Sequence, residues 1–221
     1  MSGIKAVLFD FDGTLANSEQ NHFEVWNIVL EACGEAPLDE YTYSHGLAGL
    51  PVPEAARHVK EHLSLAVPLN DIIQRKVAET GRYFTEHPVD MMPFAKDILT
   101  LCRERGLKLA LVTASSRAEL APTFKHHGLA PFFDAVVTRD DVERSKPFPD
   151  SYLLGLERLG VSAEQAVAVE DTTHGVLAAH RADIPVAAVP NEHSRSGDFS
   201  AATVVVEDGL QGVWRWIQSK L

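Results

Sequence analysis

Asp10 and Asp12 are the residues of this chain whose types and spacing point most clearly to chemistry. They follow the short apolar run Ala6–Phe9, and Gly13 and Thr14 then turn the chain. Because residues i and i+2 of a strand face the same side, both acids would lie together at the carboxyl end of a strand. Two such acids repel each other unless a cation or a shared proton offsets their charge. We therefore predict metal-assisted chemistry here, with an Asx-turn after a strand as the alternative.

The composition limits the classes of function. The chain has 221 residues, 45% of them apolar and 23% charged, which is typical of a globular protein that buries a substantial core. A net charge of −11 argues against a nucleic-acid partner, because no basic surface is available to replace phosphate counterions. Cys33 and Cys102 have neither the spacing of a metal pair nor that of a disulfide framework.

The first residues of the chain and its hydropathy indicate a compartment. The N-terminus leads directly into the first apolar run without a secretory segment, and no stretch approaches the roughly 20 apolar residues of a membrane span. We therefore predict a soluble cytoplasmic protein that has no membrane partner. Monomer and homodimer both remain open.

Helical periodicity dominates the stretch from Glu19 to His87. Phe23, Trp26 and Val29 recur at helical spacing, and nothing in this stretch indicates a buried strand. From Met91 onward, short aliphatic runs alternate with helix-length segments. The runs are Leu107 to Thr113, Asp134 to Thr138, Ala166 to Asp171, Pro185 to Val189 and Ala202 to Asp208.

This alternation predicts an α/β fold. Aliphatic strands that alternate with helices form a parallel sheet covered on both faces, and the first run belongs to the same sheet by its type. The helical stretch is then an insertion between the first strand and the rest. We predict a Rossmann-like core domain formed by residues 1–16 and 91–221, and an α-helical cap domain formed by residues 17–90.

Open α/β sheets bind ligands at the carboxyl ends of their strands. Acids, hydroxyls and one lysine collect at these ends in this chain. They are Asp10 and Asp12, then Thr113 and Ser115, then Lys146 in the loop SKPFPDSY, and finally Glu170 and Asp171.

In this order, the stretches that contain these residues resemble the four motifs of the haloacid dehalogenase-like (HAD) phosphohydrolase superfamily. DFDGTL resembles the first motif, LVTAS the second, SKPFPDSY the third and VEDTTHGVLAAHRA the fourth. The helical insertion after the first motif is similar to the C1-type cap of the subfamily that includes β-phosphoglucomutase and many sugar-phosphate phosphatases. The resemblance covers essentially the whole chain.

The resemblance implies a magnesium-dependent phosphatase. Asp10 and Asp171 would be side-chain ligands of Mg²⁺, Asp12 would contribute its backbone carbonyl, and Glu170 would act through a water. Few carboxylates, a carbonyl and waters suit this ion. The metal would also lower the repulsion between the acids and an incoming phosphate.

The resemblance also assigns the catalytic steps. Asp10 would attack phosphorus to form an aspartyl-phosphate, which splits one hard step into two. Asp12 would protonate the leaving alkoxide and then deprotonate the hydrolytic water. Thr113 and the backbone amides of Ala114 and Ser115 would donate to phosphoryl oxygens, and Lys146 would add a fixed positive charge.

Each assignment has a structural alternative. Thr113 could cap a helix, Lys146 could be a solvated loop lysine, and Glu170 and Asp171 could be acids at a helix N-terminus. His22 lies in SEQNHFEVW, where β-phosphoglucomutase-like members have a histidine that relays cap closure to the acid–base residue. An ordinary half-exposed helical histidine is the alternative.

The choice between phosphatase and phosphomutase depends on cations that bind a second phosphate. Mutases have an arginine shortly after a cap glycine, whereas no arginine follows Gly46 or Gly49 directly and Val52 occupies the expected place. Ser116 lies where mutases often have lysine, although Arg117 follows it. We therefore predict hydrolysis of a monophosphate, such as a sugar or polyol phosphate, with a β-phosphoglucomutase-like phosphomutase as the alternative.

Other departures bear on closure and on other reactions. Asn17 replaces an acid that usually lies near the hinge of the cap. A phosphonatase would need a Schiff-base lysine, for which Lys60 and Lys76 are available, but Asp12 argues against it. A dehalogenase is disfavoured because dehalogenases typically lack the second acid.

Overall fold

The sheet of this protein is parallel throughout, as the alternation of strands and helices predicts. The computed structural model describes residues 3–221. Its six strands follow the order β3-β2-β1-β4-β5-β6, so β1 and β4 lie in the middle. The strands are β1 (Ala6–Phe9), β2 (Lys108–Val112), β3 (Ala135–Val137), β4 (Ala166–Glu170), β5 (Val186–Ala188) and β6 (Val204–Val205). The predicted α/β fold is confirmed.

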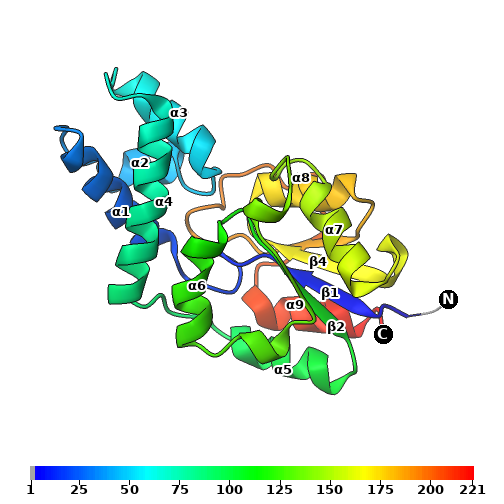
Figure 1. Ribbon diagram of the computed structural model, residues 1–221. Coiled ribbons are helices and arrows are strands. Elements are labelled where there is room, and N and C mark those ends of the chain that lie inside the picture. The colour runs from blue at the N-terminus through cyan, green and yellow to red at the C-terminus, as the bar shows by residue number, and fades with distance from the viewer. Residues whose placement is uncertain (1–2) are drawn as a thin grey trace.

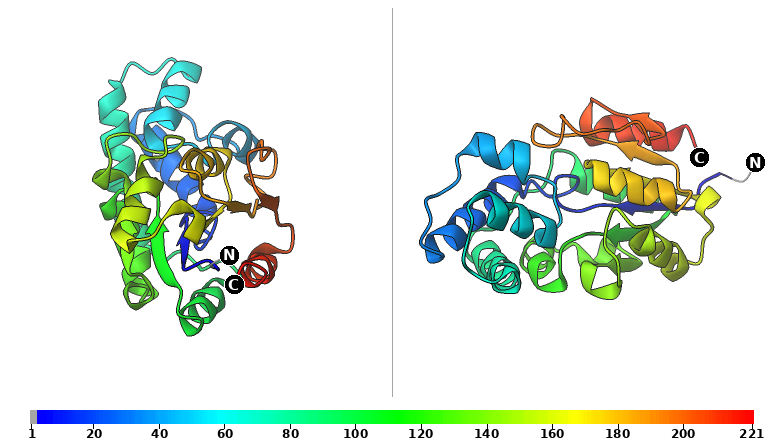
Figure 2. Two further views of the ribbon diagram at one scale, coloured as in Figure 1. Left: turned by 90° about the vertical axis from the view of Figure 1, so that its right-hand side faces the viewer. Right: turned by 90° about the horizontal axis from the view of Figure 1, so that it is seen from above.

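Five helices cover the two faces of the sheet (Figures 1 and 2). They are α5 (Ala95–Glu104), α6 (Arg117–His126), α7 (Asp150–Leu159), α8 (Thr173–Arg181) and α9 (Gly209–Gln218). Alternate residues of β1 enter different cores: Val7 packs in the core that contains residues of α5 and α9, and Leu8 in the core that contains residues of α7 and α8. Strand β1 is therefore buried on both faces.

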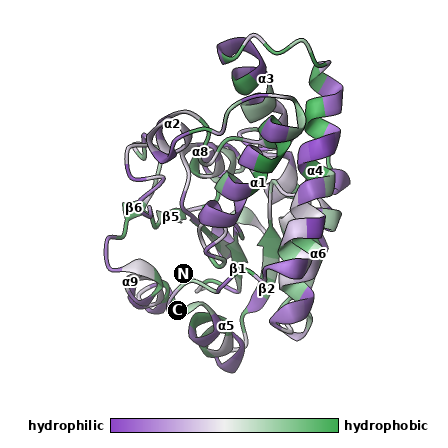
Figure 3. Cartoon of the chain, turned by 90° about the vertical axis from the view of Figure 1, so that its left-hand side faces the viewer, coloured by the Kyte–Doolittle hydropathy of each residue, from purple (hydrophilic) through white to green (hydrophobic). Residues whose placement is uncertain are grey.

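Four helices follow β1 and precede α5 in the sequence. They lie beyond the end of the sheet at which the catalytic motifs were predicted (Figure 1). They are α1 (Glu19–Ala32), α2 (Glu40–Gly46), α3 (Val52–His62) and α4 (Leu69–Glu86). Helix α4 packs against α1 and α3 and also against α6. Figure 3 shows hydrophobic and hydrophilic residues interleaved along α4 and α6, as expected for helices with one buried side.

The two chain connections between the sheet and these four helices run side by side. The N–H of Asn17 donates to the carbonyl of Asp90 (2.8 Å), and the N–H of Met92 donates to the carbonyl of Leu15 (2.8 Å). The division into a core domain and a cap domain at residues 16/17 and 90/91 stays a prediction, and these paired connections are where it would fall.

Several elements differ in length from the predicted ones. Helix α8 begins at Thr173, because the side chain of Thr172 accepts a hydrogen bond from the N–H of Gly175 and caps the helix. The last strand covers only Val204–Val205 of the predicted run, because it lies at the edge of the sheet and pairs with β5 alone. Short 3-10 turns occur at Ala130–Phe132, Arg139–Asp141 and Ala163–Gln165. Within residues 3–221, no helix is both long and apolar enough to span a bilayer.

Candidate active site

Asp10 and Asp12 lie beyond the end of β1, in the middle of the sheet. The N–H of Asp10 donates to the carbonyl of Val169 on β4 (3.0 Å), so strand pairing extends to this residue and positions its carboxylate. The chain turns at Gly13, whose φ of 80° is readily adopted by glycine alone. A Cβ at this position would also collide with the carboxylate of Asp171. Glycine therefore brings the first motif into contact with the fourth.

Three buried carboxylates gather at this edge of the sheet. Asp10, Glu170 and Asp171 each offer one oxygen within 4.8 Å of the others. The Nζ of Lys146 donates to Asp10 Oδ1 (2.5 Å), to Glu170 Oε1 (2.6 Å) and to the carbonyl of Val112 (2.8 Å). One positive charge therefore contacts two of the three acids.

The charges of this cluster perturb one another. Burial and the negative charge of Glu170 raise the pKa of Asp10 to about 8. Burial and the charge of Asp10 raise the pKa of Asp171 well above its usual range. Burial acts to lower the pKa of Lys146, but the charges of Asp10 and Glu170 outweigh it and raise the pKa above its ordinary value. The ammonium group stays charged, and without a bound cation Asp10 and Asp171 hold their protons more tightly than isolated aspartates do.

The donor set fits a hard divalent cation. Glu170 Oε1 accepts from Lys146 and from the hydroxyl of Tyr152 (2.6 Å), whereas its Oε2 is buried and has no hydrogen-bond partner within residues 3–221. Asp171 is oriented by Thr14 Oγ1 (3.2 Å) and Asn191 Nδ2 (2.9 Å). Clustered carboxylate oxygens suit Mg²⁺, which prefers oxygen ligands.

Asp12 lies apart from this cluster and is held by neutral donors. Its Oδ1 accepts from the hydroxyl of Ser18 (2.7 Å), and its Oδ2 accepts from the hydroxyl of Ser115 (2.6 Å). The Nε2 of His22 lies 3.5 Å from Oδ1. Burial acts to raise the pKa of Asp12, but the hydrogen bonds from His22, Ser115 and Ser18 outweigh it and lower the pKa below its ordinary value. Asp12 is therefore ionised at neutral pH.

The loop after β2 carries Thr113, Ala114 and Ser115 into the same cavity. The hydroxyl oxygen of Thr113 accepts from the N–H of Ser115 (3.0 Å), which tightens this loop. Thr113 does not cap α6, because Ser116 does so in a capping box with Glu119. The helix-cap alternative for Thr113 is therefore wrong, and its hydroxyl hydrogen stays available to a ligand.

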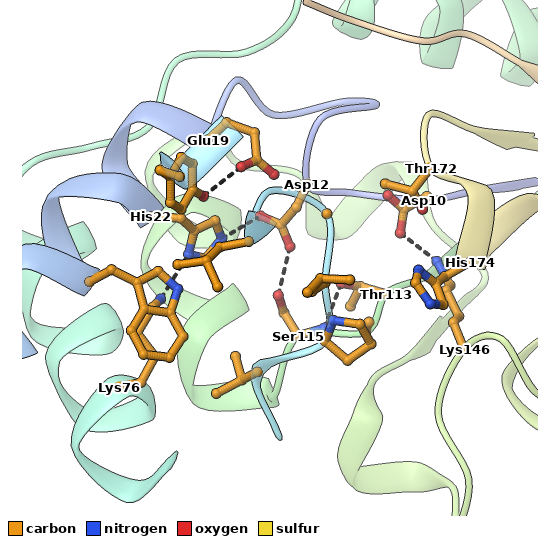
Figure 4. A pocket seen from close by; sticks show the side chains of 18 residues that line it. Asp10, Asp12, Glu19, His22, Lys76, Thr113, Ser115, Lys146, Thr172 and His174 are labelled. Carbon is orange, nitrogen blue, oxygen red and sulfur yellow. Dashed lines mark hydrogen bonds and ion pairs between the residues drawn. The ribbon is translucent and has the colours of Figure 1, made fainter. Parts of the chain in front are cut away.

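His22 connects Asp12 to a buried lysine that the sequence motifs did not reveal. The Nζ of Lys76, on α4, lies 3.1 Å from His22 Nδ1 and donates to Thr80 Oγ1 (2.9 Å). A charged ammonium group can only donate, so His22 Nδ1 accepts and Nε2–H points to Asp12. Burial lowers the pKa of Lys76 to about 8. Lys76, His22 and Asp12 thus form a continuous polar chain from α4 to the end of β1 (Figure 4).

These residues surround one cavity of about 90 Å³ between the sheet edge and the inserted helices. Figure 4 shows Asp10, Thr113 and Lys146 on the sheet side of this cavity and His22 and Lys76 on the side of the helices. The predicted site residues Asp10, Asp12, His22, Thr113, Ala114, Ser115 and Lys146 all line it. Glu170 and Asp171 lie behind Asp10 and are almost fully buried.

The residues at which mutases have cations offer no free positive charge to the cavity. Val52 lines the cavity, as does Leu50, and neither offers a charge. Arg117 does not replace the missing lysine at Ser116, because its guanidinium group pairs with Asp141 (3.0 Å). Lys60, on α3, donates to the carbonyls of residues 65 and 67, so of the two cap lysines considered only Lys76 faces the cavity.

Three residues of the site region escaped the sequence analysis: Glu19, Tyr43 and Asn191. Lys76 was considered only as a candidate Schiff-base lysine and not as a partner of His22. Lys76 had a detectable signal, because it interrupts the buried series Ile72, Thr80 and Phe84 at spacings of four residues. Glu19 and Tyr43 are joined by a hydrogen bond (2.6 Å) across 24 positions, which no local pattern reveals. Asn191 follows β5, at a strand end where a ligand-facing residue is expected.

Comparisons with known proteins identify the family of this chain. Residues 7–189 match the haloacid dehalogenase-like hydrolase family. The chain belongs to this family. Among its relatives, the protein CbbY of Rhodobacter capsulatus is 31% identical over 216 residues, covering 93% of each chain. A phosphorylated carbohydrates phosphatase of Thermotoga maritima is 34% identical over 181 residues, covering 82% of each chain.

One solved structure is similar to this chain in both fold and sequence. It is a variant of CbbY from Rhodobacter sphaeroides in complex with xylulose-(1,5)bisphosphate. The TM-score is 0.81 at 28% identity, covering 93% of this chain and 94% of that chain. The predicted family and fold are thereby confirmed.

Proposed function

We propose that this protein is a magnesium-dependent phosphatase that hydrolyses a small phosphorylated metabolite, a sugar or polyol monophosphate. The observation that carries the proposal is the arrangement around Asp10. This carboxylate lies beside two further buried acids and the Lys146 ammonium group, and Asp12 lines the same cavity. The phosphatases among the relatives support the same reaction class.

The first chemical step uses Asp10 as the nucleophile. One carboxylate oxygen attacks phosphorus, the bond between phosphorus and the ester oxygen breaks, and an aspartyl-phosphate forms. Lys146 is held against Asp10 and neutralises charge where the phosphoryl group arrives. The hydroxyl of Thr113 and the backbone amide of Ala114 can donate to the phosphoryl oxygens, whereas the N–H of Ser115 donates to Thr113 Oγ1. A bound Mg²⁺ on Asp10, Asp171, Glu170 and the carbonyl of Asp12 would supply further charge neutralisation.

Asp12 would move the proton in both steps. Because Asp12 is ionised in this structure, it would first take up a proton and then donate it to the departing alkoxide. The carboxylate that remains would accept the proton of the water that attacks the aspartyl-phosphate. Ser18 and Ser115 fix its two oxygens, and His22 approaches from α1. Because His22 and Lys76 belong to the inserted helices, the position of these helices would control how well Asp12 is oriented.

The cavity favours a monophosphate over a bisphosphate. The related CbbY structure contains a bisphosphate, so members of this family can accept a second phosphate. Here the uncharged Val52 lines the cavity, and Arg117 is paired with Asp141 instead of facing it. A second phosphate would find few unpaired cations, which supports hydrolysis rather than phosphoryl transfer through a bisphosphate.

A phosphatase screen tests this proposal. The purified protein is incubated with p-nitrophenyl phosphate and a panel of sugar and polyol phosphates, with Mg²⁺ or with EDTA. We expect phosphate release that requires Mg²⁺ and is fastest with a member of the panel. No release from any compound in the presence of Mg²⁺ would refute a phosphatase.

A second assay distinguishes hydrolysis from mutase activity. The protein is incubated with β-glucose 1-phosphate and a trace of the 1,6-bisphosphate, and glucose 6-phosphate and free phosphate are both measured. We expect free phosphate to form faster. Faster formation of glucose 6-phosphate would favour the phosphomutase alternative.

A further inference from the structure

Glu19 places a buried carboxylate on the wall of the cavity, and none of the proposed chemical steps uses it. It is the first residue of α1, and only 7% of its surface is exposed. It lines the cavity together with Asp10 and Asp12, and Figure 4 shows it on the side of the inserted helices.

A purely structural explanation of Glu19 is incomplete. An acid in the first turn of a helix interacts favourably with the helix dipole, but that interaction is available at an exposed position. Burying a carboxylate is costly unless it is paired and hydrogen-bonded. Within residues 3–221, its carboxylate has one hydrogen bond, from the hydroxyl of Tyr43 to Oε2 (2.6 Å), and forms no ion pair.

Tyr43 fixes the orientation of this carboxylate. Burial and the charge of Glu19 raise the pKa of Tyr43 well above its usual range, so the phenol keeps its proton and donates it to Oε2. The other oxygen, Oε1, accepts no hydrogen bond within the described residues. An ionised carboxylate can only accept, so Oε1 lacks a donor that a ligand in the cavity can supply.

The surroundings of Glu19 indicate which donor fits. Leu47, Leu50 and Val52 line the same region and offer no polar group, while Lys76 supplies one positive charge. The negative charge of Glu19 opposes that of Lys76, so a second phosphate gains little attraction from this lysine. An ammonium group on the ligand would lie close to Lys76, whereas a hydroxyl group donates to Oε1 without added charge.

We propose that Glu19, oriented by Tyr43, is a specificity-determining residue that accepts a hydrogen bond from a hydroxyl group of the substrate's leaving group. The substrate class is then a polyhydroxylated monophosphate whose non-phosphorylated part is uncharged. This assignment rests on the proposed phosphatase activity. Glu19 is then the residue that distinguishes a polyol ester from an alkyl ester and from a bisphosphate.

Matched substrates and matched variants test the assignment. The substrates are sn-glycerol 3-phosphate, glucose 6-phosphate, propyl phosphate, glucosamine 6-phosphate and xylulose 1,5-bisphosphate, with p-nitrophenyl phosphate as a generic ester. The variants are Glu19→Gln, Tyr43→Phe and, as a control on the same helix, Glu31→Gln, whose side chain is exposed. The readouts are kcat/KM with Mg²⁺ for each ester and Tm for each variant.

The wild type should hydrolyse the better of the two polyol esters at least about 10-fold faster than propyl phosphate or the bisphosphate. In Glu19→Gln, kcat/KM for that ester should fall about 10-fold to 100-fold, as for loss of a hydrogen bond to a charged group. The values for propyl and p-nitrophenyl phosphate should change less than about 3-fold, in line with a contact made only by the hydroxyl group. Tyr43→Phe should also lower kcat/KM for the polyol ester relative to propyl phosphate, and Glu31→Gln should leave this ratio unchanged.

Three results would overturn the assignment. They are equal hydrolysis of propyl phosphate and the polyol esters by the wild type, an equal loss for all esters in Glu19→Gln, and a preference for the bisphosphate or the amino sugar. If Glu19→Gln or Tyr43→Phe lowers Tm, the ratio of kcat/KM between polyol and propyl ester still decides, because it refers to the folded fraction alone. Failure to hydrolyse even p-nitrophenyl phosphate would instead refute the proposed function.

Discussion

Asp171→Asn should separate metal binding from folding. Asp10, Glu170 and Asp171 each place an oxygen within 4.8 Å of the others, and two unit charges at that distance repel by about 3.5 kcal/mol at an effective dielectric constant of about 20. Without metal, Asp171 relieves this repulsion by holding a proton, because burial and the charge of Asp10 raise its pKa well above the usual range. An asparagine mimics that protonated carboxyl group, so the metal-free variant should be as stable as the wild type or more stable.

The effect of Mg²⁺ on stability should be large in the wild type. An ion that binds only the folded state stabilises it by about 2.7 kcal/mol at roughly 100 times its Kd. For a chain of this size, each kcal/mol raises Tm by about 2–4 °C, so Mg²⁺ should raise Tm by about 5–11 °C. In Asp171→Asn this increase should fall below about 2 °C, because one anionic ligand and its attraction for the cation are lost.

Thermal unfolding followed by circular dichroism at pH 7.5, with EDTA or with Mg²⁺, measures both quantities. Glu207→Gln is the matched control, since it removes one exposed negative charge far along the chain from these acids and should keep the full Mg²⁺ response. A full Mg²⁺ response in Asp171→Asn would refute the assignment of Asp171 as a ligand. A large loss of metal-free stability would show that the charge of Asp171 is needed for folding.

Two further predictions follow from the perturbed groups. The folded-state pKa of Asp10 is raised from 3.8 to about 8, so the metal-free folded protein binds this proton more tightly than the unfolded chain does. The stability that this proton contributes is lost as pH rises from about 4 to about 8. Tm in EDTA should therefore fall over this pH range and should fall less with Mg²⁺, whereas a Tm that does not change with pH would contradict the shift. Lys76→Met should lower kcat by about 100-fold, the lower end of what acid–base groups contribute. It should not lower Tm, because an apolar side chain of similar length replaces a buried ammonium group. Lys125→Met, at an exposed position, is the control, and an unchanged kcat in Lys76→Met would show that Lys76 does not act through His22 on Asp12.

The residues at strand ends could be predicted from the sequence because each lies in a local motif. Asp10, Thr113, Lys146 and Asp171 follow aliphatic runs or lie in the loop after one, and parallel strands bring such ends to one edge. The order of the motifs along the chain was therefore sufficient to expect one shared site. The contact between Gly13 and Asp171 shows how closely this edge is packed.

The side of the cavity formed by the inserted helices could not be predicted in the same way. Lys76 and His22 lie 54 positions apart, and their contact depends on how α4 packs against α1. Glu19 looks like an ordinary acid at a helix N-terminus until its burial and its bond to Tyr43 are known. Helix packing decides which polar residues face the cavity, and hydrophobic periodicity gives only the face of each helix.

The most direct test of the central claim is phosphate release by Asp10→Asn. The amide keeps the shape of the side chain but is not a nucleophile, so no aspartyl-phosphate can form. With Mg²⁺ and the best ester from the screen, we expect no turnover above the uncatalysed rate and a Tm within a few degrees of the wild type. Hydrolysis by folded Asp10→Asn at a rate near that of the wild type would contradict the covalent mechanism.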